Sequence, residues 1–85
     1  MLNIYSIYDA KIEEYQTPFF AKADGAVIRG VLDAMENKQS DLARHPEDFT
    51  VFRLGAFDEE TASLDLCASP QTVCKVWELN QSASE

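Results

Sequence analysis

The sequence is poor in the residues that build metal sites and reactive centres. It has 85 residues with two cysteines, Cys67 and Cys74, and a single histidine. These cannot supply the four ligands of a structural zinc site and are too few for a disulfide scaffold. Its three glycines, Gly25, Gly30 and Gly55, are isolated, so no Gly-x-Gly phosphate-binding loop is present. We therefore predict a protein that is not an enzyme and binds neither metal nor cofactor.

Positive charge is also scarce. The chain has 15 acidic and 7 basic residues and a net charge of −8, and no two basic residues adjoin. Proteins that hold nucleic acid through its phosphates need clustered lysine and arginine, because counterion release supplies much of the affinity. The charge taken alone therefore argues against tight DNA binding and favours a protein partner with a basic surface.

Long hydrophobic runs are missing as well. No apolar run approaches the roughly 20 residues of a bilayer span, and the N-terminus lacks the pattern of a signal peptide. A hydrophobic content of 46% is nevertheless too high for a disordered chain. We expect a soluble cytoplasmic protein with one domain over residues 1–79 and a polar, frayed tail over 80–85. At this size the core is small, and a homodimer would enlarge it.

The N-terminal part alternates with a period of two, which is typical of strands. Residues 2–9 carry apolar side chains on both faces, which predicts a strand in the centre of a sheet. Pro18 cannot donate a hydrogen bond to a neighbouring strand, so residues 19–22 are predicted to form a short edge strand.

Residues 49–68 are predicted to form a β-hairpin. Phe52, Leu54 and Ala56 alternate with a mixed row, and we expect these three to face the core. A polar turn over residues 58–61 follows, and Leu64 and Leu66 are expected to point inward from the second strand.

A helix is predicted over residues 24–38, with Asp24 as its N-cap. Its apolar residues recur at three- and four-residue spacing and form one stripe: Val27, Ile28, Val31, Leu32 and Met35. A polar loop is expected over 39–48. Ser69-Pro70 resembles a helix start, although residues 70–78 also alternate like a strand. The predicted fold class is α+β: a small, mostly antiparallel sheet packed against one main helix, 24–38, with a possible short C-terminal helix.

Three groups of side chains are candidates for a functional site. His45, Glu47 and Asp48 share one polar loop beside a proline, which is typical of turn chemistry rather than acid–base catalysis. The carboxylates around residues 58–65 lack the ligand spacing of a calcium loop and indicate a solvated acidic turn. Exposed aromatic rings can stack on the bases of single-stranded nucleic acid, and the candidates are Tyr5, Tyr15, Phe19, Phe49 and Phe57.

Four stretches resemble one known family. They are residues 4–9 with Tyr15, residues 18–20 with 26–29, the block 46–58, and residues 73–79. The block, in which Pro-Glu-Asp-Phe runs into Leu-Gly-Ala-Phe-Asp, is the most specific. Together these stretches resemble the small nonstructural protein of gokushoviruses, the single-stranded DNA microviruses of bacteria.

This resemblance implies a non-enzymatic early phage protein, absent from the virion, that takes part in genome replication in the host cytoplasm. It also implies that the block 46–58 is a structural signature, in which Pro46 and Asp48 set a turn, Gly55 permits a close backbone approach or bulge, and Asp58 begins the hairpin loop.

Two hypotheses about function follow from the charge and the resemblance. In the first, the protein is an acidic adaptor that acts on the viral or host replication or packaging machinery during the switch to single-stranded DNA synthesis. In the second, it is a single-stranded DNA-binding protein, in which a dimer arranges cations and aromatic rings into a groove. The candidate contact residues are Tyr5, Lys11, Tyr15, Phe19, Lys22, Arg29 and Arg53.

Overall fold

The computed structural model describes the backbone of residues 1–83 and the side chains of residues 1–79. The chain begins with three strands, β1 (Leu2–Asp9), β2 (Glu14–Tyr15) and β3 (Phe19–Ala21). Three helical segments follow, α1 (Asp24–Glu36), α2 (Asp41–Arg44) and the 3₁₀ helix η1 (Pro46–Asp48). A long hairpin of β4 (Phe49–Asp58) and β5 (Ser63–Lys75) then leads into α3 (Val76–Ala83).

The strands form one antiparallel sheet. Its order is β2-β1-β4-β5, and β3 pairs with β1 on the same side as β2. The predicted strand 2–9 and its central position are confirmed, because β1 has partners along both edges. The predicted short edge strand is also confirmed, although it ends at Ala21.

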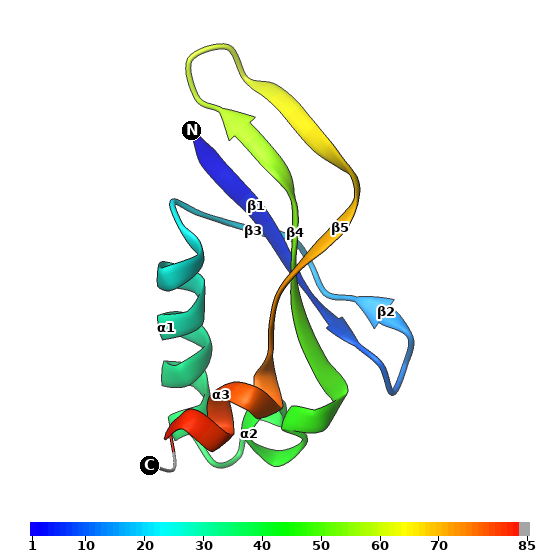
Figure 1. Ribbon diagram of the computed structural model, residues 1–85, viewed down its shortest axis with the longest axis vertical. Helices are drawn as coiled ribbons and strands as arrows, with labels where there is room; N and C mark the ends of the chain where they lie inside the picture. The colour runs from blue at the N-terminus through cyan, green and yellow to red at the C-terminus, as the bar shows by residue number, and fades with distance from the viewer. Residues whose placement is uncertain (84–85) are drawn as a thin grey trace.

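The predicted packing of the sheet on one main helix is wrong. The protein is mostly β, with a curled, half-barrel antiparallel sheet and only short helices. Figure 1 shows the helices gathered beside the lower part of the sheet, while the β4–β5 hairpin continues well above them. The physical reason is the length of the hairpin strands: β5 alone has 13 residues, as many as α1.

The core lies between the sheet and the helices. Tyr5 and Val51 are both 0% exposed, and the buried cluster around them is completed by Ile7, Val27, Val31, Met35, Phe49 and Val76. The predicted inward row of the hairpin is confirmed at Ala56, which is 7% exposed, but it is wrong at Phe52, which faces away from the core while its neighbour Val51 faces it. The cause is a bulge: Tyr5 pairs with Arg53 and Ile4 with Gly55, so Leu54 is left out of register.

Helix α1 begins where predicted, but its N-cap is a different residue. Ala23 is the N-cap and makes no side-chain capping bond, so Asp24 is the first helical residue rather than the cap. The Asp24 carboxylate instead accepts a 2.7 Å hydrogen bond from the buried Tyr5 hydroxyl. Burial, and secondly this hydrogen bond, raises the pKa of Tyr5. The helix ends at Glu36, two residues earlier than predicted, so Lys38 lies outside it.

The segment predicted as a polar loop, 39–48, contains two short helical turns. Ser40 caps α2 by accepting a 3.2 Å hydrogen bond from the Ala43 backbone amide. The Pro46-Glu47-Asp48 sequence forms η1, with the proline in its first turn.

The predicted hairpin is confirmed, but its second strand is longer than expected. A helix start at Ser69-Pro70 is wrong, because both residues lie within β5 and the helix begins only at Val76. The strand-like alternation of residues 70–78 is a true strand signal as far as Lys75: Thr72 pairs with Phe52, and Cys74 pairs with Val51. Helix α3 includes the backbone of residues 80–83 from the predicted tail, and residues 84–85 lie outside the described part of the chain.

Candidate interaction face

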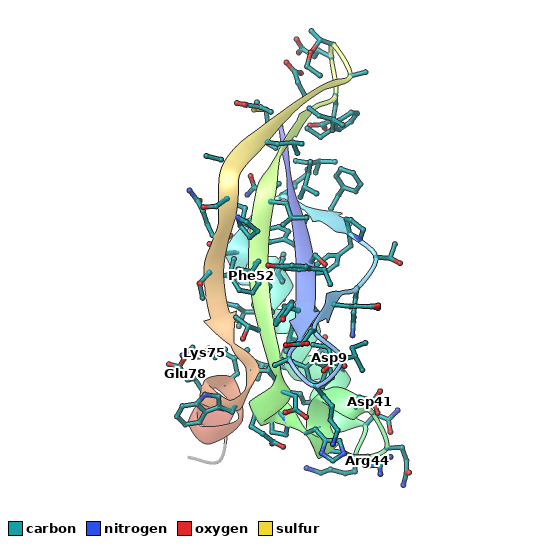
Figure 2. The ribbon with its side chains drawn as sticks, turned by 90° about the vertical axis from the view of Figure 1, so that its right-hand side faces the viewer. Asp9, Asp41, Arg44, Phe52, Lys75 and Glu78 are labelled. Carbon is teal, nitrogen blue, oxygen red and sulfur yellow. The ribbon has the colours of Figure 1, made fainter. Side chains whose placement is uncertain are left out.

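The alternation of β1 divides the sheet into two faces. Tyr5 and Ile7 point toward the helices, so the even-numbered residues of β1 point to the opposite side. In the part of the chain that the structure describes, no helix lies over that side, which we call the open face. Figure 2 looks onto it, with Phe52 near its middle and α1 behind the sheet.

The half of the open face near the hairpin turn is aliphatic and aromatic. Paired residues share a face in an antiparallel sheet, and two rows can be followed from strand to strand through the registers. We call these rows the tip patch: Leu2, Ile4, Phe20, Phe57, Leu64 and Leu66, of which Ile4 is buried at 5% exposed. The rings of Phe20 and Phe57 pack edge to face with centroids 5.8 Å apart. Leu64 and Leu66 are 60% and 64% exposed, so their predicted inward orientation is wrong.

The other half of the open face carries an aromatic cluster. Tyr8, Tyr15 and Phe52 lie with ring centroids 4.8 Å (Tyr8–Tyr15), 5.7 Å (Tyr15–Phe52) and 6.3 Å (Tyr8–Phe52) apart. The register extends the Tyr15–Tyr8 row through Thr50 to Lys75 on β5. Tyr15 is half exposed, so this cluster presents aromatic surface to a partner.

The predicted contact residues do not gather on one face. Of the aromatic ones, Tyr15 lies on the open face, whereas Tyr5 is fully buried on the helix side and Phe19 stacks against it at 5.9 Å. The cations come from four different segments: Lys11 lies in the β1–β2 turn, Lys22 follows β3, Arg29 is on the exposed side of α1, and Arg53 lies beside the bulge, where it donates to the Cys67 Sγ. A single groove that combines all seven is therefore not formed in this conformation. The sequence analysis did not name Tyr8, Phe52 or Lys75 as contact residues. For Tyr8 a signal was present, because the predicted strand 2–9 carries apolar side chains on both of its faces.

The signature residues have structural roles. Pro46 starts η1, and the Asp48 carbonyl accepts a 2.8 Å hydrogen bond from the Ala10 backbone. At Gly55, an added Cβ would lie 2.5 Å from the Asp65 carbonyl oxygen, so the backbones of β4 and β5 approach closely. The Asp58 carboxylate accepts from the Glu60 backbone at 2.9 Å and so shapes the hairpin turn.

One group of possible metal ligands is present within the described residues. His45, Glu47 and Asp48 bring their ligand atoms within 4.8 Å of one another. All three come from one surface turn, and the first two are exposed, with His45 Nδ1 3.8 Å from Glu47 Oε2. Exposed groups of this kind are common without a metal, and the prediction of no metal site stays a prediction.

The thiols are separate and half-buried. Cys67 and Cys74 are free. Burial raises the pKa of Cys74, and the negative charges of Glu78 and Asp24 add to the shift. A raised pKa keeps the Cys74 thiol protonated and hence a weak nucleophile at neutral pH.

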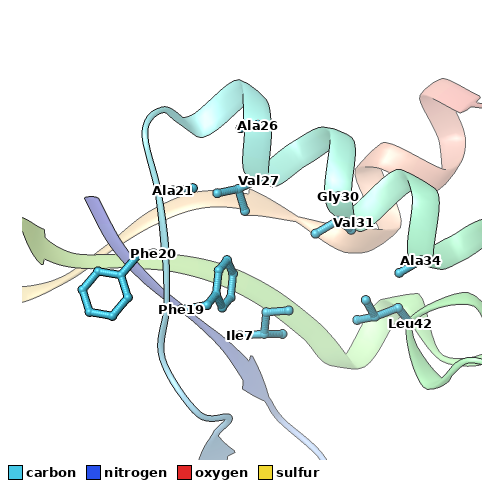
Figure 3. Close-up of a pocket in the computed structure, with 10 residues that line it drawn as sticks. All are labelled: Ile7, Phe19, Phe20, Ala21, Ala26, Val27, Gly30, Val31, Ala34 and Leu42. Atoms are coloured by element: carbon cyan, nitrogen blue, oxygen red, sulfur yellow. The ribbon is translucent and has the colours of Figure 1, made fainter. Parts of the chain in front are cut away.

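An apolar hollow lies on the helix side of the sheet (Figure 3). It opens between β3 and α1, has a volume of about 350 Å³ and is lined entirely by apolar residues: Ile7, Phe19, Phe20, Ala21, Ala26, Val27, Gly30, Val31, Ala34 and Leu42. Since none of these side chains can donate a proton or coordinate an ion, the hollow has no chemistry beyond apolar contact.

The comparisons with known proteins place the chain in a family. A family model described as "Phage ORF5 protein" matches residues 2–79. No curated protein and no solved structure matches the chain. Among the described residues, no helix is both long enough and apolar enough to cross a membrane.

Proposed function

This chain belongs to the Phage ORF5 protein family, and from that membership we propose that it is a non-enzymatic phage protein that acts in genome replication by binding another protein through its open face. The narrower placement, among gokushoviruses with single-stranded DNA genomes and in the host cytoplasm, is part of the same proposal. It is supported by the resemblance of the block 46–58 and the three shorter stretches.

The observation that carries the proposal is the exposed, largely uncharged open face. Contiguous apolar surface of this kind marks interaction sites on soluble proteins, because water contact with it is unfavourable. Aromatic side chains such as Tyr15 and Phe52 are also enriched at protein–protein interfaces. The carboxylates of Asp58, Glu59 and Glu60 line a separate hollow at the hairpin turn together with Met1.

The charge favours a protein as the partner. The chain carries a net charge of −8, and in the rows of the open face Lys75 is the one basic residue. A negatively charged body repels DNA phosphates and attracts basic protein surfaces, which raises the rate of association with them. This supports an acidic adaptor on the replication or packaging machinery, acting in the switch to single-stranded DNA synthesis.

The replication role is tested with Tyr15→Ser in the phage genome. Tyr15 is half exposed, so its loss should leave the fold intact and weaken only the contact with the partner. We expect infected cells to accumulate duplex phage DNA normally but about tenfold less single-stranded DNA, the effect of removing one aromatic anchor worth roughly 1.4 kcal/mol. The measurement is quantification of both DNA forms through infection.

The matched control is Ile12→Ser, which removes an exposed apolar side chain from the β1–β2 turn, outside the open face; Ile12 is 62% exposed and Tyr15 48%. It should behave like the unaltered phage. If a full deletion of the gene leaves both DNA forms unchanged, the proposed role in replication is wrong.

A second function, binding of single-stranded DNA, is favoured by one specific observation. The aromatic cluster Tyr8–Tyr15–Phe52 lies on an open sheet face with Lys75 in the same row. Aromatic rings on such a surface can stack with bases at roughly 1–3 kcal/mol per base.

A titration with a fluorescent single-stranded oligonucleotide separates the two functions. For an adaptor we expect no saturable binding at micromolar protein, even at low salt, because the face lacks clustered cations. Saturable binding that weakens with added salt and is lost in Tyr15→Ser would instead establish the DNA-binding function.

A further inference from the structure

We propose that the tip patch is the interface of a homodimer, in which a second copy of the chain packs its own tip patch face to face against it. The inference concerns a different half of the open face from the aromatic cluster, and it does not depend on the proposed role in replication. It rests on the composition of the patch, the exposure of its residues and the surface area of the chain.

The composition fits a second copy better than any charged partner. None of the six residues of the tip patch can carry a charge, and its neighbours at the hairpin turn are acidic: Asp58, Glu59 and Glu60. Two copies with a net charge of −8 each repel one another over most of their surface. The tip patch is a surface on which they can meet without opposing carboxylates. An uncharged, apolar centre with a charged rim is the usual anatomy of such interfaces.

The patch is exposed on a part of the sheet that the helices do not support. Phe20, Leu64 and Leu66 are each more than half exposed, at 52%, 60% and 64%. Figure 1 shows the hairpin extending beyond the helices at this end. Leaving several large apolar side chains together in water is unfavourable, and face-to-face packing of two sheets is the standard way in which open β-sheets bury such rows.

The chain has surface available for a partner. A compact protein of 9.6 kDa is expected to expose about 5,100 Å², whereas this elongated chain exposes 5768 Å². A standard interface takes roughly 800 Å² from each partner. A two-fold axis would bring the tip patch against itself, so one patch supplies both sides.

The test is sedimentation equilibrium of the purified full chain and three variants. We expect the unaltered protein to sediment at twice its 9.6 kDa, and Leu64→Glu and Leu66→Glu to raise the dissociation constant at least tenfold, because each places a carboxylate in the interface twice. Both leucines are largely exposed in a single chain, so the variants should fold; circular dichroism checks this.

The matched control is Ser63→Glu, which adds the same charge to the same strand but on its opposite face, since Ser63 pairs with Asp58 rather than with the patch rows. It should remain as dimeric as the unaltered protein. A chain that is monomeric at several hundred micromolar, or a dimer that is unaffected by both leucine variants, would overturn the proposal. Neither outcome bears on the DNA forms measured in infected cells, so the two proposals fail separately.

Discussion

Gly55→Ala is expected to lower the free energy of unfolding by about 3 kcal/mol, the upper part of the range for inserting a methyl group into filled space. The added Cβ would lie 2.5 Å from the Asp65 carbonyl oxygen and 2.8 Å from the Leu66 Cα. Both are backbone atoms of β5, so no side chain can rotate away, and the strands themselves must separate. Urea denaturation followed by circular dichroism, at one fixed protein concentration, measures the loss.

Gly30→Ala serves as its control. A Cβ at Gly30 would meet nothing within 4 Å, and the residue lies inside α1. Alanine should therefore stabilise the protein by about 0.5–1 kcal/mol through helix propensity. If Gly55→Ala were as well tolerated as Gly30→Ala, the close approach of β4 and β5 at Gly55 would be wrong.

Phe49→Ala should destabilise the protein by about 4 kcal/mol, because it deletes a large ring from the core and leaves a cavity. Phe49 is 4% exposed and belongs to the same buried cluster as Val51 and Val76. For a domain of this size such a loss is a large share of a total of roughly 5–10 kcal/mol. Thermal unfolding should show a transition lowered by at least 15 °C.

Tyr15→Ala is the control for Phe49→Ala, because it removes an aromatic ring that lies outside the core. Both aromatic residues were candidates for base stacking from the sequence, but Tyr15 is half exposed and should cost less than about 1 kcal/mol. Equal destabilisation by the two substitutions would contradict the placement of Phe49 in the core and Tyr15 on the open face.

Local patterns in the sequence predicted most of the strands. The two-sided apolar alternation of residues 2–9 indicated a central strand, because successive side chains of a strand point to opposite faces. Pro18 indicated an edge strand after it, because proline has no amide hydrogen to donate. The hairpin was likewise predicted, since its polar turn separates two alternating segments.

The orientation of the hairpin could not be predicted, because it depends on a bulge. With a period of two, one extra residue at Leu54 exchanges the faces of everything on one side of it. The sequence pattern around Phe52 is equally compatible with both orientations, and only the pairing with β1 decides. The same limit applies to Ser69-Pro70, where a local helix-start signal was overridden by pairing of residues 71–75 with β4.

For the candidate site, the sequence predicted a binding surface but not its position on the protein. The scarcity of histidine, cysteine and clustered cations indicated a binding protein rather than an enzyme, and that prediction is untested. The particular face was not foreseen, because Leu64 and Leu66 read as core residues in any alternating strand. Whether such residues face a core or solvent is set by what covers the sheet, and no helix among the described residues lies over the open face.

The interruption in β5 bears on how this protein avoids polymerising. β5 is the last strand of the sheet, so one of its sides offers backbone groups to any extended chain in solution. Pairing with β4 breaks between Leu66 and Gln71, and Pro70 within that break has no amide proton to give. Two short stretches of edge remain instead of one continuous template, which disfavours fibril growth from a chain so rich in strands.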